Sequence, residues 1–173
     1  MNHAVYCLAR DQAHVETIIE SLKRQGFARG DISVLFPDQG ASRDFAHEQH
    51  TKLPEGAATG GVAGMGAGAI MGWLAGIGTL ALPGLGPFVA AGPIMAALSG
   101  AAVGGAAGGL IGALIGVGIP EYEAKLYEGK LRSGSVLVSV HAEHVDRVTT
   151  AKRLFEECGA EHIHATSEAH VSH

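Results

Sequence analysis

The middle of this chain lacks ionisable side chains. Between Gly56 and Pro120 there is no Asp, Glu, Lys, Arg or His, so the flanks carry all 12 Lys and Arg and all 17 Asp and Glu. Aromatic residues are scarce, at 5%, and cysteine occurs only twice in 173 residues. The chain therefore divides into a polar arm, an apolar insert and a second polar arm.

These scarcities exclude several classes of protein. The basic residues form no run and the net charge is −5, whereas a nucleic-acid groove needs a concentrated positive face. Cys7 and Cys158 have no partner pattern, so we expect neither a disulfide framework nor a cysteine zinc site. The first residues lack the basic start and apolar stretch of a secretory signal. We expect no nucleic-acid partner.

Motifs for catalysis and cofactor binding are also missing. The run Gly64–Gly68 nearly matches a dinucleotide fingerprint, but no strand precedes it, no acidic residue follows at the needed distance, and no lysine is present for a phosphate-binding loop. No G-x-S-x-G elbow occurs. We therefore expect a non-enzymatic protein without a cofactor, and interpret three carboxylates on one helical segment as surface charge: Asp146, Glu156 and Glu157.

The first polar arm has a strand-helix-strand pattern. Residues 3–9 form a strand-like run, and Asp11 is placed to cap the helix that follows. Gly26 stops this helix, and a second strand ends at Pro37. The apolar positions that define the helix face and the second strand are Val15, Ile18, Ile19, Leu22, Ile32, Val34 and Phe36.

The second polar arm repeats this plan at a constant separation of 133 residues. The alternating strand Val136–Val140 is followed by a helix that Gly159 stops, and residues 162–166 can form a last strand. The helix face consists of Val145, Val148, Ala151 and Phe155. Matched positions include Val5 with Val138, Ala9 with Ala142, Val15 with Val148, Leu22 with Phe155 and Gly26 with Gly159.

Two such units predict an α+β fold. Right-handed crossovers interleave them into a four-stranded, ferredoxin-like sheet with both helices on one face. Residues 1–38 supply the first half of this domain, residues 39–55 a linker, and residues 56–120 an apolar helical hairpin. Residues 121–173 supply a short amphipathic helix, over 121–131, and the second half of the domain.

The insert carries two glycine runs at strict four-residue spacing. Four residues are close to one helical turn, so each run makes a bare stripe along one side of a helix. Each glycine costs about 1 kcal/mol in a helix relative to alanine, which close helix packing in an apolar setting offsets. The expected helix-packing residues are Gly60, Gly64, Gly68, Gly72, Gly76, Gly100, Gly104, Gly108, Gly112 and Gly116.

A turn rich in glycine and proline, residues 82–87 with Gly92-Pro93, separates the two runs and predicts a helical hairpin. Arms of about 23 and 26 residues are on the order of 35–39 Å long, enough for a bilayer core of ~30 Å. Flanking basic residues then predict a bacterial inner-membrane protein with both termini cytoplasmic, whose partners are the lipid bilayer, copies of itself and other membrane subunits.

Two alternatives to a membrane hairpin remain open, because glycine and alanine are barely hydrophobic. The insert can pack with other copies inside a soluble, cytoplasmic homo-oligomer such as a cage or filament. It can also fold back into the core of its own domain. An exposed insert is excluded, because a monomer does not tolerate so large an apolar surface.

Histidine is the one abundant reactive residue type, with ten in the chain. His162 and His164 have the spacing of one strand face, and His141 and His144 bracket the end of another strand. Imidazoles at these spacings are weak candidates for a transition-metal or ligand-sensing site. No spacing defines a complete ligand set, so a resident metal is not expected.

The order of these segments resembles a known family. A strand-helix-strand unit, the stretch Lys52–Gly61, a glycine-zipper hairpin and the stretch Gly118–Glu123 are similar to bacterial general stress proteins of the 17M-like family. The same plan is similar to the ActD membrane subunit of alternative complex III. The resemblance implies a stress-associated membrane or assembly protein, and no catalytic residues.

Overall fold

The computed structural model describes residues 3–37, 78–82, 86–93 and 109–167. They form an α+β domain with one six-stranded sheet in the order β3-β4-β2-β5-β1-β6, in which all neighbouring strands are antiparallel. The strands are β1 (His3–Ala9), β2 (Ile32–Pro37), β3 (Gly78–Leu82), β4 (Gly86–Ala91), β5 (Val136–Ala142) and β6 (Glu161–Ser167). The helices are α1 (Gln12–Arg24), η1 (Arg29–Asp31), α5 (Gly109–Gly116), α6 (Glu121–Arg132) and α7 (Val145–Glu157).

The two polar arms form the elements that their sequence patterns predict. Asp11 caps α1, because its side chain accepts a hydrogen bond from the His14 backbone N–H at 2.8 Å. The first residues of β1 and β5 are 133 positions apart, and so are those of α1 and α7. Gly26 and Gly159 end the two helices with φ of 76° and 74°, a conformation that glycine adopts without strain.

The antiparallel register relates the two halves of the domain by an approximate two-fold axis. Tyr6 pairs with Ser139, and these two residues are themselves 133 positions apart. β1 and β5 therefore cross at matching points of the repeat. Arg147 of α7 joins the halves further, because its guanidinium donates to the Gln25 and Gly26 carbonyls at 3.1 and 2.9 Å and stacks on the Phe27 ring.

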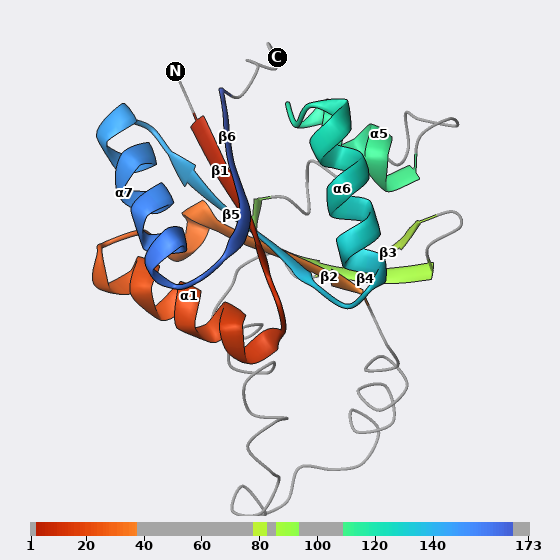
Figure 1. The fold of residues 1–173 in the computed structure, drawn as a ribbon, viewed down its shortest axis with the longest axis horizontal. Coiled ribbons are helices and arrows are strands. Elements are labelled where there is room, and N and C mark those ends of the chain that lie inside the picture. Colours follow the sequence, from red (N-terminus) through yellow and green to blue (C-terminus); the bar gives the residue numbers. More distant parts are fainter. Residues whose placement is uncertain (1–2, 38–77, 83–85, 94–108, 168–173) are drawn as a thin grey trace, which may run out of the picture.

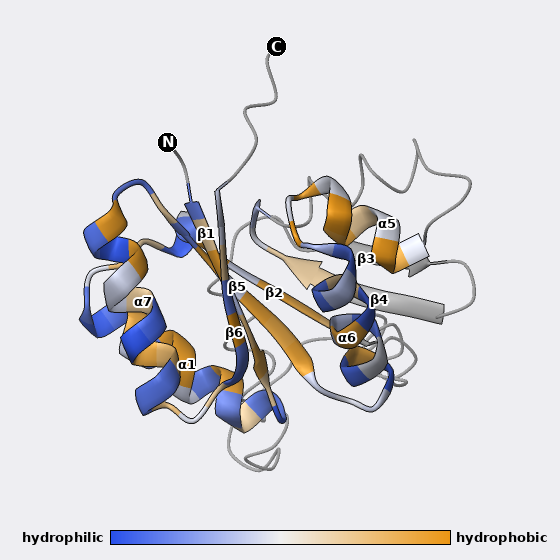
Figure 2. Cartoon of the chain, turned by 45° about the horizontal axis from the view of Figure 1, so that its top comes forward, coloured by the Kyte–Doolittle hydropathy of each residue, from blue (hydrophilic) through white to orange (hydrophobic). Residues whose placement is uncertain are grey.

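Helices cover both faces of the sheet (Figure 1). α1 and α7 cover the first face, where alternate residues of β1 and β5 are buried with Ile18, Leu22 and Phe155. α5 and α6 cover the second face, where the intervening strand residues are buried with Leu114, Tyr127 and Leu131. Figure 2 shows hydrophobic colouring on strands that lie between the two helical layers. The domain has three layers: α1 and α7 share one face, as the sequence predicted, whereas the layer of α5 and α6 on the other face was not predicted.

The prediction that residues 56–120 form a membrane-anchoring helical hairpin is wrong. Among the described residues, no helix combines the length and the apolar character that crossing a bilayer requires. The region expected to supply the end of the first helix and the turn instead contains β3 and β4, and β4 pairs with β2. The described part of the chain therefore gives no support for an inner-membrane location, and the lipid bilayer as a partner stays a prediction.

The last part of the insert has a different physical role from the expected one. α5 has eight residues and buries Leu110, Ala113 and Leu114 against the second face of the sheet. The apolar character of this segment thus serves the core of its own domain. Of the glycine runs, only Gly112 and Gly116 fall in the described part; Gly60 to Gly76 and Gly100 to Gly108 lie outside it, as does the linker at 39–55.

Gly92 permits β4 to join the sheet, and its replacement tests this junction. It has a φ of 88°, and a Cβ there would lie 2.2 Å from the Ile32 carbonyl oxygen. Left-handed strain alone costs roughly 1–2 kcal/mol, and the contact with backbone adds to it. We expect Gly92→Ala to lower the free energy of unfolding by at least ~2 kcal/mol in urea denaturation.

Gly129→Ala is the matched control for this prediction. Gly129 lies inside α6, and no described atom comes within 4 Å of an added Cβ. We expect it to raise the free energy of unfolding by up to about 1 kcal/mol. Equal stability of the two variants would contradict the close approach of Gly92 to β2.

Candidate functional site

The four candidate histidines occupy different environments. His141 is half-buried near the end of β5, and His144 is an exposed residue that precedes α7 without capping it through its side chain. His162 is exposed and His164 is half-buried in β6. Among the described residues, no three His, Cys, Asp or Glu side chains are grouped so that they could hold one metal ion.

β6 is irregular where the paired histidines lie. His162 has a φ of 51°, rare for a residue with a side chain, and the pairing of β6 with β1 shifts register between Tyr6 and Leu8. This is a β-bulge or a related irregularity, so the two-residue spacing of a regular strand does not describe His162 and His164. The prediction that both imidazoles lie on one strand face depends on that regular spacing.

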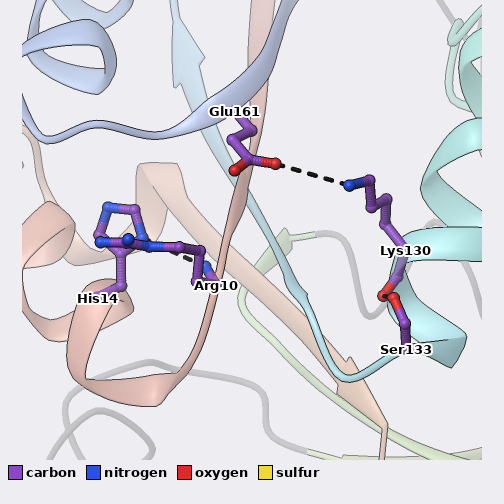
Figure 3. A network of polar contacts seen from close by, with 5 residues as sticks. All are labelled: Arg10, His14, Lys130, Ser133 and Glu161. Atoms are coloured by element: carbon purple, nitrogen blue, oxygen red, sulfur yellow. Dashed lines mark hydrogen bonds and ion pairs between the residues drawn. The ribbon is translucent and has the colours of Figure 1, made fainter.

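The residues that do come together form a seam of polar contacts between α6 and β6. His164 Nδ1 lies 3.1 Å from Glu123 Oε1, and the Tyr127 hydroxyl donates to the His162 carbonyl at 2.8 Å. Lys130 Nζ lies 3.7 Å from Glu161 Oε2 (Figure 3). We call these six residues the α6–β6 seam.

Helix geometry explains why the α6–β6 seam forms. Glu123, Tyr127 and Lys130 are spaced by four and three residues, so they project from one side of α6. That side meets the outermost strand on the second face of the sheet. The outer pair, Lys130 with Glu161, is about half exposed and contributes little to stability. The side chains of Glu123 and His164 are only 27% and 28% exposed, so solvent screens their contact less than it screens the contact of Lys130 with Glu161.

Tyr127 is the buried centre of the α6–β6 seam. The residue has no exposed surface, and its burial, followed by the nearby Glu123 charge, raises the pKa of the phenol well above its usual range. Tyr127 therefore stays protonated and acts as a hydrogen-bond donor. The amphipathic pattern of residues 121–131 predicted a helix here. No local pattern predicts that the His162 carbonyl of β6 accepts a hydrogen bond from Tyr127.

A second polar contact lies on the opposite face of the sheet. His14 is only 8% exposed; its Nδ1 is 3.2 Å from the Arg10 backbone N–H (Figure 3), and its Nε2 is 2.7 Å from the Cys158 carbonyl oxygen. Since Nδ1 accepts from a backbone N–H, Nε2 carries the proton and donates. His14 thus ties the start of α1 to the end of α7, a role that sequence reasoning missed.

Both cysteines are free thiols. Cys7 is buried in β1, and this burial raises the pKa of its thiol well above the usual value. Cys158 is half-buried, and its thiol lies 3.5 Å from the Ser21 hydroxyl. A protonated, buried thiol is a poor nucleophile and metal ligand. Cys7 therefore belongs to the core.

The described glycines of the second run face away from the core of the domain. Leu110, Ala113 and Leu114 are buried, whereas Gly112 is half-exposed and Gly116 is exposed. Two residues correspond to about 200° around a helix, so Gly112 lies opposite Leu110 and Leu114. No described atom lies within 4 Å of a Cβ built on Gly112. The bare stripe is thus on the outer side of α5.

Protein-family models, characterised proteins and solved structures were all compared with the chain, and none matches it. The α6–β6 seam holds a helix to an edge strand, and His14 holds two helices together. The outer side of α5 belongs to the predicted helix-packing surface, and no described atom lies within 4 Å of a Cβ built on Gly112 there.

Tyr127→Phe tests the central contact of the α6–β6 seam. The variant keeps the buried ring but leaves the His162 carbonyl without this donor, so we expect a loss of about 1 kcal/mol at neutral pH. The pH dependence has a definite sign. In the unfolded chain tyrosine ionises near pH ~10, while the fold keeps Tyr127 protonated, so this contribution to stability falls as pH rises above that value.

The measurement is urea unfolding of both proteins from neutral pH to above pH ~10. We expect the stability difference between wild type and Tyr127→Phe to shrink at alkaline pH, because phenylalanine has no proton to lose. Tyr122→Phe is the control, since Tyr122 is 77% exposed. A difference that stays constant with pH would contradict the buried, protonated phenol.

Proposed function

We propose that this protein is a non-enzymatic structural module that assembles with copies of itself through its charge-free insert. The observation that carries the proposal is the orientation of α5. One side of this helix is committed to the core through Leu110, Ala113 and Leu114, while Gly112 and Gly116 form a bare stripe on the other side. Such stripes allow two helix backbones to approach closely.

The composition of the insert supports contacts with protein. Residues 56–120 carry no charge, and each part of the insert that the structure describes packs against protein: β4 pairs with β2, and α5 covers the second face of the sheet. A segment without charges offers nothing to repel an identical copy. Close packing of its glycines offsets their cost of about 1 kcal/mol each in a helix.

The covered sheet limits where a partner can bind. α1 and α7 occupy one face and α5 and α6 the other, so a partner meets the outer sides of helices or the edges of the sheet. Both helical layers are held by specific contacts, His14 on the first face and the α6–β6 seam on the second. The described domain therefore suits a rigid structural unit.

The ferredoxin-like arrangement is part of the proposal. Its support is the strand order β2-β5-β1-β6, with α1 linking β1 to β2 and α7 linking β5 to β6. The β3–β4 pair and the α5–α6 layer are additions to that plan. The resemblance to 17M-like general stress proteins adds a stress-associated setting.

Gly112→Leu tests the assembly in the full-length protein. No described atom lies within 4 Å of a Cβ added at Gly112, so the substitution creates no clash there within the described domain, but a leucine fills the stripe that a second copy would contact. We expect sedimentation analysis to show large species for the wild type and a shift towards smaller ones for Gly112→Leu, with an unchanged circular dichroism spectrum.

Gly129→Leu is the matched control, because it makes the same change at an open glycine on α6. We expect it to leave the assembly size unchanged. Two results would overturn the proposal: a wild-type protein that sediments as a monomer from micromolar to submillimolar concentration, or a Gly112→Leu variant that assembles as the wild type does.

A further inference from the structure

The two edges of the sheet differ in how they are protected. β6 forms one edge and carries a charged residue, Glu161, the left-handed His162 and an irregular register with β1. Charges and bulges at an edge strand prevent other strands from pairing with it. β6 is therefore a guarded edge.

β3 forms the opposite edge and has none of these features. Its sequence, Gly-Thr-Leu-Ala-Leu, carries no charge and no proline, and it pairs with β4 over five consecutive positions without a register shift. Of the described strands, only β4 pairs with β3. No described strand covers its outer edge, and an edge strand presents a row of backbone donors and acceptors to any strand that can align with it.

We infer that the outer edge of β3 pairs antiparallel with β3 of a second copy, which joins the two sheets into one continuous sheet. This inference rests on the proposed self-assembly and names one of its interfaces. A two-fold contact brings identical segments together, and like charges directly opposite each other destabilise a strand pair. An uncharged strand meets this requirement for self-pairing.

The length of β3 defines the register. A five-residue strand overlaps its own copy completely only when its middle residue, Leu80, lies opposite the Leu80 of the other copy. Thr79 then lies opposite Ala81 of the other copy. Directly opposed residues have Cα atoms about 4.5–5.5 Å apart, which a disulfide spans, whereas Cα atoms more than ~7 Å apart cannot be bridged. A ladder of five residue pairs is only marginally stable by itself, and the contacts of α5 add to the stability of the assembly.

The test is disulfide cross-linking of full-length protein in a Cys158→Ser background, with mild copper-catalysed air oxidation. Serine keeps a hydroxyl beside Ser21, and the remaining Cys7 is buried. We expect Leu80→Cys to give a cross-linked dimer on non-reducing gels, with Thr79→Cys and Ala81→Cys each giving at least tenfold less. The double variant Thr79→Cys/Ala81→Cys should cross-link as readily as Leu80→Cys.

Ser167→Cys is the control on the guarded edge, because Ser167 is exposed in β6, and we expect no dimer from it. Circular dichroism verifies that each variant folds. The inference is overturned if Leu80→Cys fails to cross-link while the wild type still assembles, a result that leaves the proposed function intact. It is also overturned if Thr79→Cys or Ala81→Cys alone cross-links best, or if Ser167→Cys cross-links equally well. Monomeric wild type would overturn the proposed function itself.

Discussion

The structure depends on the burial of β1 and β5 on both faces. Val5, Cys7 and Ala9 of β1 belong to the core beneath α1 and α7, while the residues between them belong to the core beneath α5 and α6. A strand that is apolar at consecutive positions needs a cover on each side. The two strand-helix-strand units supply only α1 and α7, so the second cover must come from the chain between β2 and β5.

This requirement gives the apolar insert a structural meaning. Its last part, α5, and the helix that follows it, α6, form the second layer, and the α6–β6 seam holds that layer to the edge of the sheet. The hydrophobic side of α5 is buried in the core of the domain through Leu110, Ala113 and Leu114. The other side of α5, which carries Gly112 and Gly116, faces away from this core, so the proposed assembly uses that side.

Local patterns predicted the arms well, because each signal acts over a few residues: the Asp11 cap, the Gly26 and Gly159 stops, and the helix faces. Val145 is an exception; as the first residue of α7 it is 67% exposed. The insert was mispredicted because four-residue glycine spacing fits a helix in lipid and a helix on a sheet equally. The run of consecutive apolar residues in β1 was the sequence signal for a covered second face, and the prediction did not use it. The α6–β6 seam depends on contacts between residues about 35 positions apart and on the irregular stretch of β6. No local pattern encodes either feature.

Amide hydrogen exchange of the full-length protein, followed by mass spectrometry, tests the central claim most directly. In the structure the Val117 and Ile119 amides donate to carbonyls of α5, and α5 packs on the same core as β1 and β5. The account predicts that α5 is protected to the same degree as these strands in the absence of lipid. Rapid exchange of α5 while β1 and β5 remain protected, or protection of α5 only after lipid vesicles are added, would contradict it.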